Sequence, residues 1–174
     1  FVRVPMAAAT LVVTPEHPSD GLLPSVLALA AVFGTGHHAA VSAGVQAGST
    51  VAVIGDGAVG LSAVLAAQRL GAGRIIAMSR HESRQVVATE FGATDIVAAR
   101  GAKGVAALMK LTDGVVVDCA LECVGTKESM QQTLDSARPG GKVGFVGVPA
   151  GGPELPVRQM FSSNVGVNGG VAPV

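Results

Sequence analysis

The sequence predicts an α/β fold in which helices cover both faces of a doubly wound parallel sheet. Two observations favour this fold. Short β-branched runs alternate with helical runs from Val51 onward. The runs are also continuously apolar, as expected for parallel strands that are covered on both faces. A repeated strand, helix and strand pattern is typical of a doubly wound sheet.

The expected elements follow in order from residue 51. Glycines mark the ends of the first two helices, because Gly71 and Gly92 each follow a helical run. Residues 138–140, Arg-Pro-Gly, close the last helix. We expect strands over residues 51–54, 74–78, 95–97, 115–119, 142–146 and 164–168, and helices over 58–70, 82–91, 104–111 and 126–137.

The segment before the first strand has a different pattern. Residues 1–18 contain proline and are expected to be extended, and residues 20–45 are expected to be helical with breaks at Pro24 and at 34–36. We therefore expect residues 1–45 to lead in from a neighbouring domain and residues 46–174 to form the main domain. We also expect the closing helix of that domain to lie beyond Val174, which would leave an exposed apolar face that favours self-association.

Composition narrows the class of protein. The 174 residues suit one domain with a sizeable core, since 49% are apolar and 14% are charged. The formal net charge is zero, so no general electrostatic field attracts nucleic acid or an anionic membrane. The most apolar stretch, residues 22–33, is too short to span a bilayer, and no signal peptide is visible. Cys119 and Cys123 are expected to be buried free thiols in a reducing compartment. We therefore expect a cytoplasmic chain.

Residues 55–60 form a G-x-G-x-x-G turn that directly follows an apolar strand and directly opens a helix. This context makes the motif specific for a dinucleotide. The first glycine allows a tight turn, the second lets the pyrophosphate approach the backbone, and the third lets helix and strand pack closely. The free N–H groups and the positive end of the helix then face the phosphates. The predicted cofactor-binding residues of this turn are Gly55, Asp56, Gly57, Ala58, Val59 and Gly60.

The end of the second strand favours NADP over NAD. An NAD site usually carries an acid about 20 residues past the glycines, which binds the ribose 2′-OH, but Ser79 stands at this position. The hydroxyl of Ser79 can donate to a 2′-phosphate, Arg80 can stack on adenine or pair with the phosphate, and Arg84 can add a second charge. Two such contacts, about 1.5–3 kcal/mol each, favour NADP strongly. The alternative is that both arginines are solvated surface charges and the cofactor is NAD.

A series of short stretches lies between residue 34 and residue 149. They are GTGHHAA at 34–40, AGSTVAV at 47–53, the glycine turn at 55–60, RLGA at 69–72, EFGAT at 90–94, ECVG at 122–125, RPGG at 138–141 and GVP at 147–149. In these stretches and their order, the chain resembles the zinc-dependent alcohol dehydrogenases of the medium-chain dehydrogenase/reductase superfamily.

The resemblance implies a Rossmann fold with strand order 3-2-1-4-5-6, in a two-domain enzyme that transfers hydride between a nicotinamide cofactor and an alcohol or carbonyl substrate. It places Thr35 near the nicotinamide and the backbone of residues 167–169 at the carboxamide. For Cys123, at the end of the fourth strand, packing alone is as good an explanation as contact with the cofactor. The further residues implied at the adenosine, the nicotinamide ribose, the nicotinamide channel and the carboxamide are Cys123, Val124, Gly125, Gly147, Val148, Val167, Asn168 and Gly169.

The zinc ligands of the family have no counterparts in this sequence. The first two lie in an N-terminal domain that precedes the matching region, and the third would fall at Ala31, which cannot coordinate a metal. Adjacent His37 and His38 lie nearby, but such histidines more often pack or face solvent. We therefore predict no metal site in this chain, and cofactor binding without turnover, because a Lewis acid, a proton relay and a substrate pocket are missing.

Other functions remain open at this stage. Ala31 favours a zinc-free quinone- or enoyl-reductase-type relative. A non-catalytic module that senses the dinucleotide redox state also fits, because the chain can bind a dinucleotide without reacting. An S-adenosylmethionine methyltransferase uses a glycine turn too, but that fold normally has an acid where Ser79 stands. By resemblance, the chain is expected to form a homo-oligomer edge to edge through the last strand, over residues 165–171.

Overall fold

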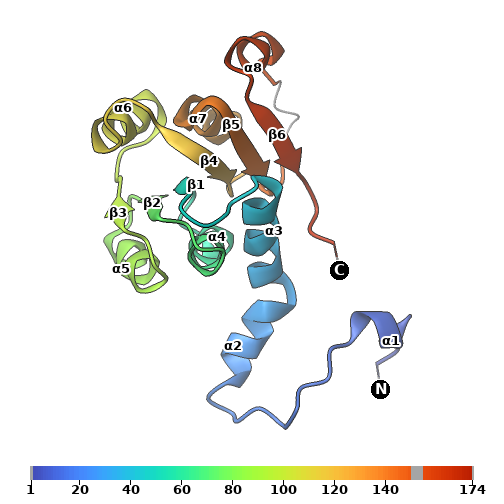
Figure 1. Ribbon diagram of the computed structural model, residues 1–174. Coiled ribbons are helices and arrows are strands. Elements are labelled where there is room, and N and C mark those ends of the chain that lie inside the picture. The colour runs from blue at the N-terminus through green and yellow to red at the C-terminus, as the bar shows by residue number, and fades with distance from the viewer. Residues whose placement is uncertain (1, 150–154, 174) are drawn as a thin grey trace.

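Six parallel strands form one sheet in the order β3-β2-β1-β4-β5-β6 (Figure 1). The computed structural model describes residues 2–149 and 155–173. The predicted fold class and strand order are confirmed. The strands are β1 (Thr50–Ile54), β2 (Arg74–Met78), β3 (Asp95–Ile96), β4 (Val117–Glu122), β5 (Ala137–Phe145) and β6 (Gly166–Gly169).

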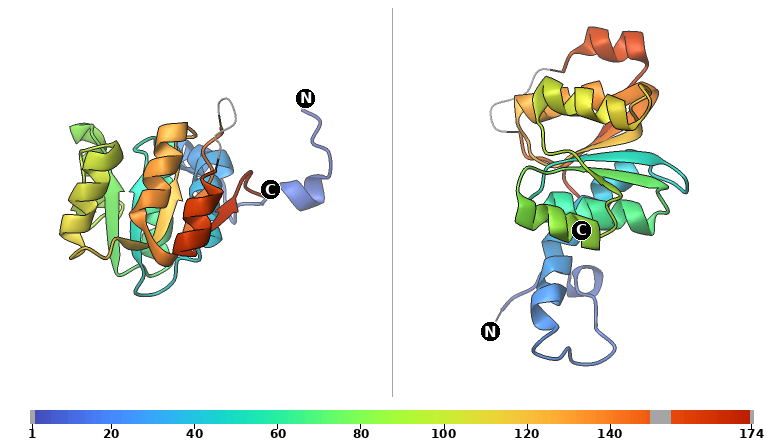
Figure 2. Two further views of the ribbon diagram at one scale, coloured as in Figure 1. Left: turned by 90° about the horizontal axis from the view of Figure 1, so that it is seen from above. Right: turned by 90° about the vertical axis from the view of Figure 1, so that its left-hand side faces the viewer.

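Helices cover both faces of the sheet (Figure 2). One face carries α3 (Gly34–Ser42), α4 (Ala58–Arg69) and α5 (Glu82–Glu90), and the other carries α6 (Gly101–Leu111), α7 (Lys127–Ser136) and α8 (Val157–Ser163). Each face has its own apolar core. The first core depends on small side chains of α4, since Ala63, Ala66 and Ala67 are fully buried and let the helix lie close to the sheet.

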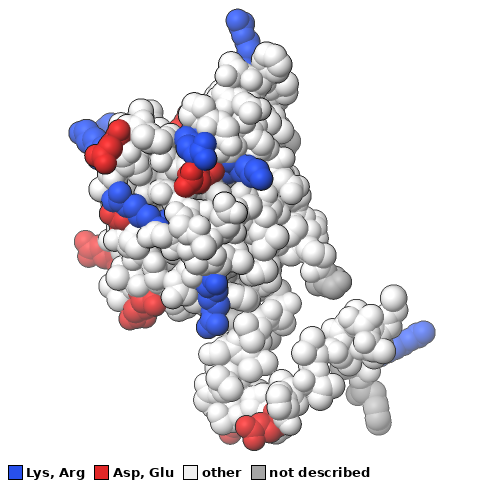
Figure 3. Space-filling view, viewed as in Figure 1, with Lys and Arg blue, Asp and Glu red and all other residues white. Residues whose placement is uncertain are grey.

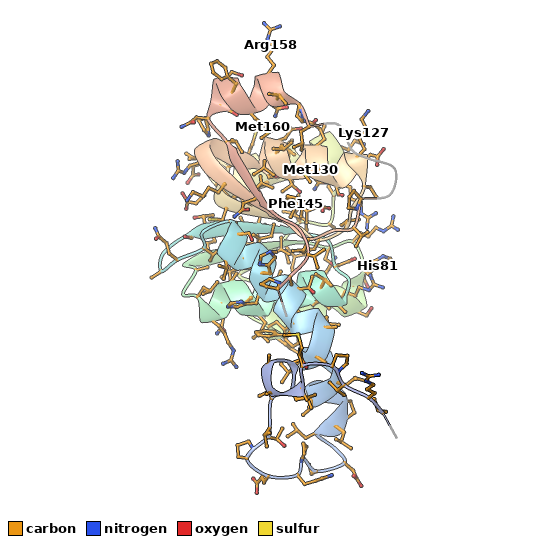
Figure 4. The ribbon with its side chains drawn as sticks, turned by 90° about the vertical axis from the view of Figure 1, so that its right-hand side faces the viewer. His81, Lys127, Met130, Phe145, Arg158 and Met160 are labelled. Atoms are coloured by element: carbon orange, nitrogen blue, oxygen red, sulfur yellow. The ribbon has the colours of Figure 1, made fainter. Side chains whose placement is uncertain are left out.

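The second core lies between the sheet and α7. Figure 4 shows Met130 of α7 and Phe145 of β5 one above the other, with Met160 of α8 beyond them. Arg158 of α8 points away from this core. Full burial of an apolar side chain of this size contributes about 1.5–3 kcal/mol relative to exposure. The core therefore holds the ends of β4 and β5 in place beneath α7.

The N-terminal part of the chain differs from the prediction. Residues 2–22 leave the body of the molecule and include a short helix, α1 (Ala7–Thr10) (Figure 1). One continuous helix then runs through α2 (Leu23–Ala28), the π-helical stretch η1 (Leu29–Phe33) and α3. The predicted breaks at Pro24 and at 34–36 are wrong. Pro24 lies in the first turn, where a missing N–H costs nothing.

Gly36 serves close packing instead of breaking the helix. A β-carbon on Gly36 would come within 2.7 Å of the Ser62 carbonyl carbon, because α3 crosses α4 at this point. The side chains of Ala39 and Ala40 in α3 are fully buried in the first core. The domain boundary between residues 45 and 46 stays a prediction, and α3, which precedes it, packs into the same core as the helices that follow it.

The helix over Leu23–Ser42 is long and apolar enough, by length and composition, to cross a membrane. This helix is longer than the apolar stretch at residues 22–33, which was too short to span a bilayer. A single helix of this kind near the N-terminus is weak evidence for a membrane span. Its second half packs against α4 and β5. The cytoplasmic location stays a prediction.

Three further boundaries correct the predicted elements. The fourth strand runs from Val117 to Glu122 rather than over 115–119, because Val116 has φ 60° and lies in the turn before the strand. Residues 138–140 lie inside β5, whose pairing with β4 shifts register between Val117 and Cys119. The helix predicted over 104–111 begins at Gly101. Helix α8 was not predicted, because most of its apolar side chains, such as Val157 and Phe161, are exposed and only Met160 packs against the second core.

An ion pair between β2 and β3 predicts how stability depends on pH. Arg74 Nε and Nη2 each lie 2.8 Å from an oxygen of Asp95. The Arg74 guanidinium lowers the pKa of Asp95 from 3.8 to about 2. Because the folded pKa lies below the unfolded one, the pair stabilises the fold above about pH 4 and loses this effect as the pH falls toward 2. Asp95→Asn should therefore lower the free energy of unfolding at pH 7 by about 1 kcal/mol or less, since the pair is partly exposed.

Denaturant unfolding of the wild type and Asp95→Asn between pH 7 and pH 2 measures this effect. The two curves should converge as the pH approaches about 2. An equal deficit at every pH would show that the substitution acts through packing rather than through charge.

Candidate functional site

The carboxyl ends of β1 and β4 define the candidate site. These two neighbouring strands lie at the centre of the sheet, and their chains leave to helices on opposite faces, α4 and α7. A crevice forms at such a switch point, and ligands of open α/β sheets bind there. A cavity of about 150 Å³ lies at this point and is lined by Gly55, Val124 and residues of α6 and α7. The glycine turn and the ECVG stretch therefore meet in space, as the resemblance implies.

The three glycines of the turn have different surroundings. Gly55 has φ +120°, and a β-carbon there would lie 2.9 Å from Val124 Cγ2. A β-carbon on Gly60 would overlap the carbonyl oxygen of Gly55, because α4 starts very close to the end of β1. A β-carbon on Gly57 would have no atom within 4 Å, so this residue faces open space. Gly60 therefore lies where helix and strand pack closely, and the approach of a pyrophosphate to the open space at Gly57 stays a prediction.

The first turn of α4 presents free backbone donors. Gly57 is the N-cap residue, and no side chain accepts a hydrogen bond there. The N–H groups of the first helical turn have no partner within the helix, and the helix dipole adds partial positive charge. A pyrophosphate satisfies both requirements. The described residues of the turn therefore fit the phosphates of a dinucleotide.

Asp56, the second residue of the turn, binds two residues predicted to contact the adenosine ribose. Ser79 Oγ donates to Asp56 Oδ2 over 3.0 Å, and Arg84 Nη1 donates to Asp56 Oδ1 over 3.0 Å. Asp56 is 6% exposed and Ser79 is 2% exposed. Burial raises the pKa of Asp56, but the hydrogen bonds from Ser79 and Arg84 outweigh it and hold that pKa below its usual value. The sequence did not predict that these side chains bind one another.

Arg80 lies differently from Arg84. Its side chain is exposed, and its Nε lies 3.3 Å from Nε2 of His81. Figure 4 shows His81 at the outer edge of the molecule, on the same side as Lys127, which follows the end of β4. Arg80 therefore follows the end of β2 directly, with a side chain that is not bound to Asp56.

Glu122, at the end of β4, organises the turn that leads to α7. It is fully buried, and its Oε1 accepts hydrogen bonds from Val124 N at 2.9 Å, Gly125 N at 2.8 Å and Ser129 Oγ at 2.6 Å. Thr126 and Ser129 complete a capping box that starts α7. Within the part of the chain that the structure describes, Oε2 of Glu122 is the only buried side-chain polar atom without a partner. Sequence reasoning placed Glu122 only in the family stretch, although a carboxyl at the end of an apolar strand is a usable signal.

A second cavity brings together residues predicted near the nicotinamide. It measures about 250 Å³, and Thr35, Gly147 and Val148 line it together with residues 170–172. Thr35 Oγ1 donates to Ala31 O within the long helix. Gly125 has φ +90°, and a β-carbon there would overlap the carbonyl oxygen of Val148, so the ends of β4 and β5 are in close contact.

Residues 167–169 are divided between two faces of β6. Val167 lines a cavity of about 280 Å³ with Glu122 and Met130, on the other side of the strand from Thr35. The side chain of Asn168 accepts a hydrogen bond from the N–H of Gly169. Gly169 leads directly into Gly170 of the cavity near Thr35. Of the three, only Gly169 adjoins that cavity among the described residues.

The cysteines and histidines form no metal centre in the described ranges. No group of three or more His, Cys, Asp or Glu side chains there could hold a metal ion. Ala31 lies in η1 without a donor atom, and the ring of His37 packs 6.2 Å from that of Phe33. Both cysteines are free, and burial raises the pKa of each thiol, so they are poor metal ligands and nucleophiles at neutral pH. The described residues do not fit a zinc ion.

The cavity of about 370 Å³ lies away from this site. Ser49, Asp118, Arg138 and Lys142 line it at the amino edge of the sheet, opposite the glycine turn. Residues that sequence reasoning missed lie instead around the cavity at the switch point. Among them are Arg100 and Gly101 at the start of α6, Thr126 and Ser129 at the start of α7, and Gln132 within α7.

Comparison with known proteins shows the family of the chain. The family model described as zinc-binding dehydrogenase matches residues 58–172, more than half of the chain. The chain belongs to this family. It is 38% identical over 142 residues to sorbitol dehydrogenase of Bacillus subtilis, covering 82% of this chain and 40% of that protein. It is 36% identical to the NADP-dependent isopropanol dehydrogenase of Thermoanaerobacter brockii, covering 82% of this chain and 41% of that protein.

Solved structures give the same result for this zinc-binding dehydrogenase chain. Zinc-dependent alcohol dehydrogenase 2 from Streptococcus pneumonia superposes with a TM-score of 0.86 at 32% identity, covering 98% of this chain and 48% of that one. Benzyl alcohol dehydrogenase from Acinetobacter calcoaceticus superposes with a TM-score of 0.78 at 34% identity, covering 92% and 43%. The chain spans less than half the length of these relatives. The resemblance to zinc-dependent alcohol dehydrogenases is confirmed.

Proposed function

We propose that the chain is the NADP(H)-binding part of an oxidoreductase that transfers hydride between a nicotinamide cofactor and an alcohol or carbonyl substrate. The observation that carries the proposal is the uncapped start of α4, where Gly57 leaves open space in front of free backbone donors. The cavity at Thr35, Gly147 and Val148 supports a nicotinamide at the far end of the same edge. Hydride chemistry comes from the cofactor when it is bound.

The residues of this chain bind and orient the cofactor in the proposal. The first turn of α4 holds the pyrophosphate, and the ECVG turn, fixed by Glu122, closes the crevice opposite Gly55. Thr35 and the backbone of residues 147–148 bound one side of the nicotinamide. The chain alone binds the cofactor without turnover, because its described residues offer no metal-binding group. A complete substrate pocket would come from the rest of a longer protein.

NADP is the proposed dinucleotide. Ser79 stands where an NAD site carries an acid, and Arg80 is exposed beside it at the end of β2. Several relatives are described as NADP-dependent isopropanol dehydrogenases, with 33–36% identity to this chain. We further propose a homo-oligomer through β6, which is an edge strand of the sheet, and a cytoplasmic location.

Calorimetric titration of the chain with NADP, NAD and S-adenosylmethionine tests the proposal. NADP should bind at least tenfold more tightly than NAD, which is about 1.4 kcal/mol, and S-adenosylmethionine should not bind. Arg80→Gln should weaken NADP about tenfold and leave NAD within about twofold, because only NADP carries the 2′-phosphate. Arg69→Gln, at the opposite end of α4, is the matched control and should change neither. Tighter binding of NAD than of NADP would contradict the cofactor assignment.

A zinc-free reductase of the same superfamily is the second candidate. The observation that favours it is Ala31, which stands in η1 at the expected position of a zinc ligand. The coding sequence upstream distinguishes the two candidates. A Cys and a downstream His-Glu pair there would support a zinc enzyme. A non-catalytic dinucleotide sensor requires that no substrate domain is encoded in the same chain.

A further inference from the structure

The ends of β1 and β2 lie side by side and bring Asp56 next to Ser79. Ile54 pairs with Met78 in the parallel register, so the turn after β1 and the start of the loop after β2 leave the sheet together. The ribose of a dinucleotide binds at this position in the fold. Any charge on the two loops therefore acts on the ribose 2′-position.

The charge at this position comes from the glycine turn rather than from β2. The carboxylate of Asp56 is almost fully buried and accepts hydrogen bonds from both Ser79 Oγ and Arg84 Nη1, each over 3.0 Å. Ser79 has one hydroxyl proton to donate, and Asp56 accepts it. Arg84 is about half exposed, with a side-chain exposure of 49%, and its Nη1 is the donor bound to Asp56.

The same two side chains are the ones that a 2′-phosphate requires. A phosphate at the ribose would need the Ser79 proton and the Arg84 guanidinium, both of which Asp56 already binds. The 2′-phosphate would also bring up to two negative charges close to the Asp56 carboxylate. The two groups would repel each other strongly, because the carboxylate is buried. A ribose 2′-OH brings no such charge and can donate to Asp56 or Ser79.

We propose that Asp56 determines dinucleotide specificity, because its carboxylate takes the place of the 2′-phosphate on Ser79 and Arg84 and competes with it. The carboxylate orders both side chains in the free chain and reduces the advantage of NADP over NAD. Arg80, which is not bound to Asp56, supplies the charge that favours NADP. This inference rests on the proposed dinucleotide function, but it does not depend on which dinucleotide the wild type prefers.

Asp56→Asn tests the proposal, with the dissociation constants of NADP and NAD measured for each chain. The asparagine keeps an acceptor oxygen and a similar volume but removes the charge. The ratio of NADP affinity to NAD affinity should rise about tenfold, mainly through NADP. In the Arg84→Gln background the same substitution should raise the ratio by no more than about threefold, because the guanidinium that it releases is absent.

Asp118→Asn is the matched control. Asp118 also accepts hydrogen bonds from a backbone N–H and from an arginine, Arg138, but it lies at the amino edge of the sheet. Its substitution removes the same charge and should leave the ratio unchanged. Asp56→Ser, which keeps a small acceptor, replaces Asp56→Asn if the latter does not fold, and its ratio should rise in the same direction.

The outcomes separate the two proposals. An unchanged or lower ratio in the Asp56 variants, while the wild type binds a dinucleotide, overturns the competition by Asp56 and leaves the proposed function intact. An equal rise in the Asp118 control overturns it as well, because the effect would then come from net charge. A wild type that binds neither NADP nor NAD overturns the proposed function and this inference together.

Discussion

Replacing Gly60 by alanine is expected to destabilise the chain and to abolish tight dinucleotide binding. The added β-carbon would overlap the carbonyl oxygen of Gly55, and both groups belong to backbone that cannot rotate away. Overpacking of this kind costs about 1–3 kcal/mol. Relief of the overlap has to move the start of α4 away from β1. The phosphate-binding N–H groups move with it, so the affinity for NADP should fall at least tenfold.

Gly57→Val is the contrasting variant in the same turn. Gly57 has φ −77° and ψ 179°, which valine adopts without strain, and no atom lies within 4 Å of the new β-carbon position. Its thermal midpoint should stay within a few degrees of the wild type, while the side chain blocks the pyrophosphate and lowers NADP affinity at least tenfold. Thermal and urea unfolding of both variants measure the effect on stability, and titration with NADP measures the effect on binding. Normal NADP affinity in Gly57→Val would show that the pyrophosphate does not lie at this turn.

Glu122→Ala is expected to have the second large effect. It removes the acceptor of Val124 N, Gly125 N and Ser129 Oγ, all in the turn that closes the crevice. Each buried donor left without a partner costs about 1–3 kcal/mol. Ser129 Oγ keeps Thr126 O as an acceptor, so the free energy of unfolding should fall by about 2 kcal/mol or more through the two backbone N–H groups. NADP affinity should fall as well, because Val124 then no longer has a fixed position against Gly55.

Two controls define the role of Glu122. Glu122→Gln keeps one acceptor oxygen and should recover at least half of the lost stability. Glu128→Ala removes an exposed carboxyl from the first turn of α7 and should cost about 1 kcal/mol or less. If Glu122→Ala unfolds at the same urea concentration as the wild type, the three hydrogen bonds do not stabilise the turn.

Charged side chains are distributed unevenly over the surface of the molecule. Figure 3 shows charged side chains gathered on the side of α5 and α6, with few over α2, α3 and β6. The zero net charge therefore hides an uneven distribution.

The central sheet could be predicted from sequence because its signals are local. β1 and β2 are mostly buried apolar runs, and the turn after β1 has glycines whose roles follow from backbone sterics. The long helix over Leu23–Ser42 was broken in the prediction, since Pro24 and Gly36 usually interrupt helices. Tertiary position decided otherwise, because Pro24 falls in a first turn and Gly36 at a helix crossing.

The polar contacts of the site could not be predicted in the same way. Asp56 and Ser79 are 23 residues apart, and only the register of β1 and β2 brings them together. The sequence predicted that Ser79 and Arg84 bind a 2′-phosphate, whereas in the structure both donate hydrogen bonds to Asp56. The hydrogen bonds of Glu122 could not be predicted either, because their donors lie in a turn whose shape depends on the Glu122 carboxyl.

The backbone amides of residues 57–60 provide the most direct test of the central claim, that the start of α4 binds the pyrophosphate of a nicotinamide dinucleotide. Hydrogen exchange and amide chemical shifts of the chain can be followed by NMR during titration with NADPH. We predict that the amides of Ala58, Val59 and Gly60 shift and become protected, together with those of the turn at Val124 and Gly125. Saturable binding of NADPH that leaves these amides unchanged, or no binding at all, would contradict this claim.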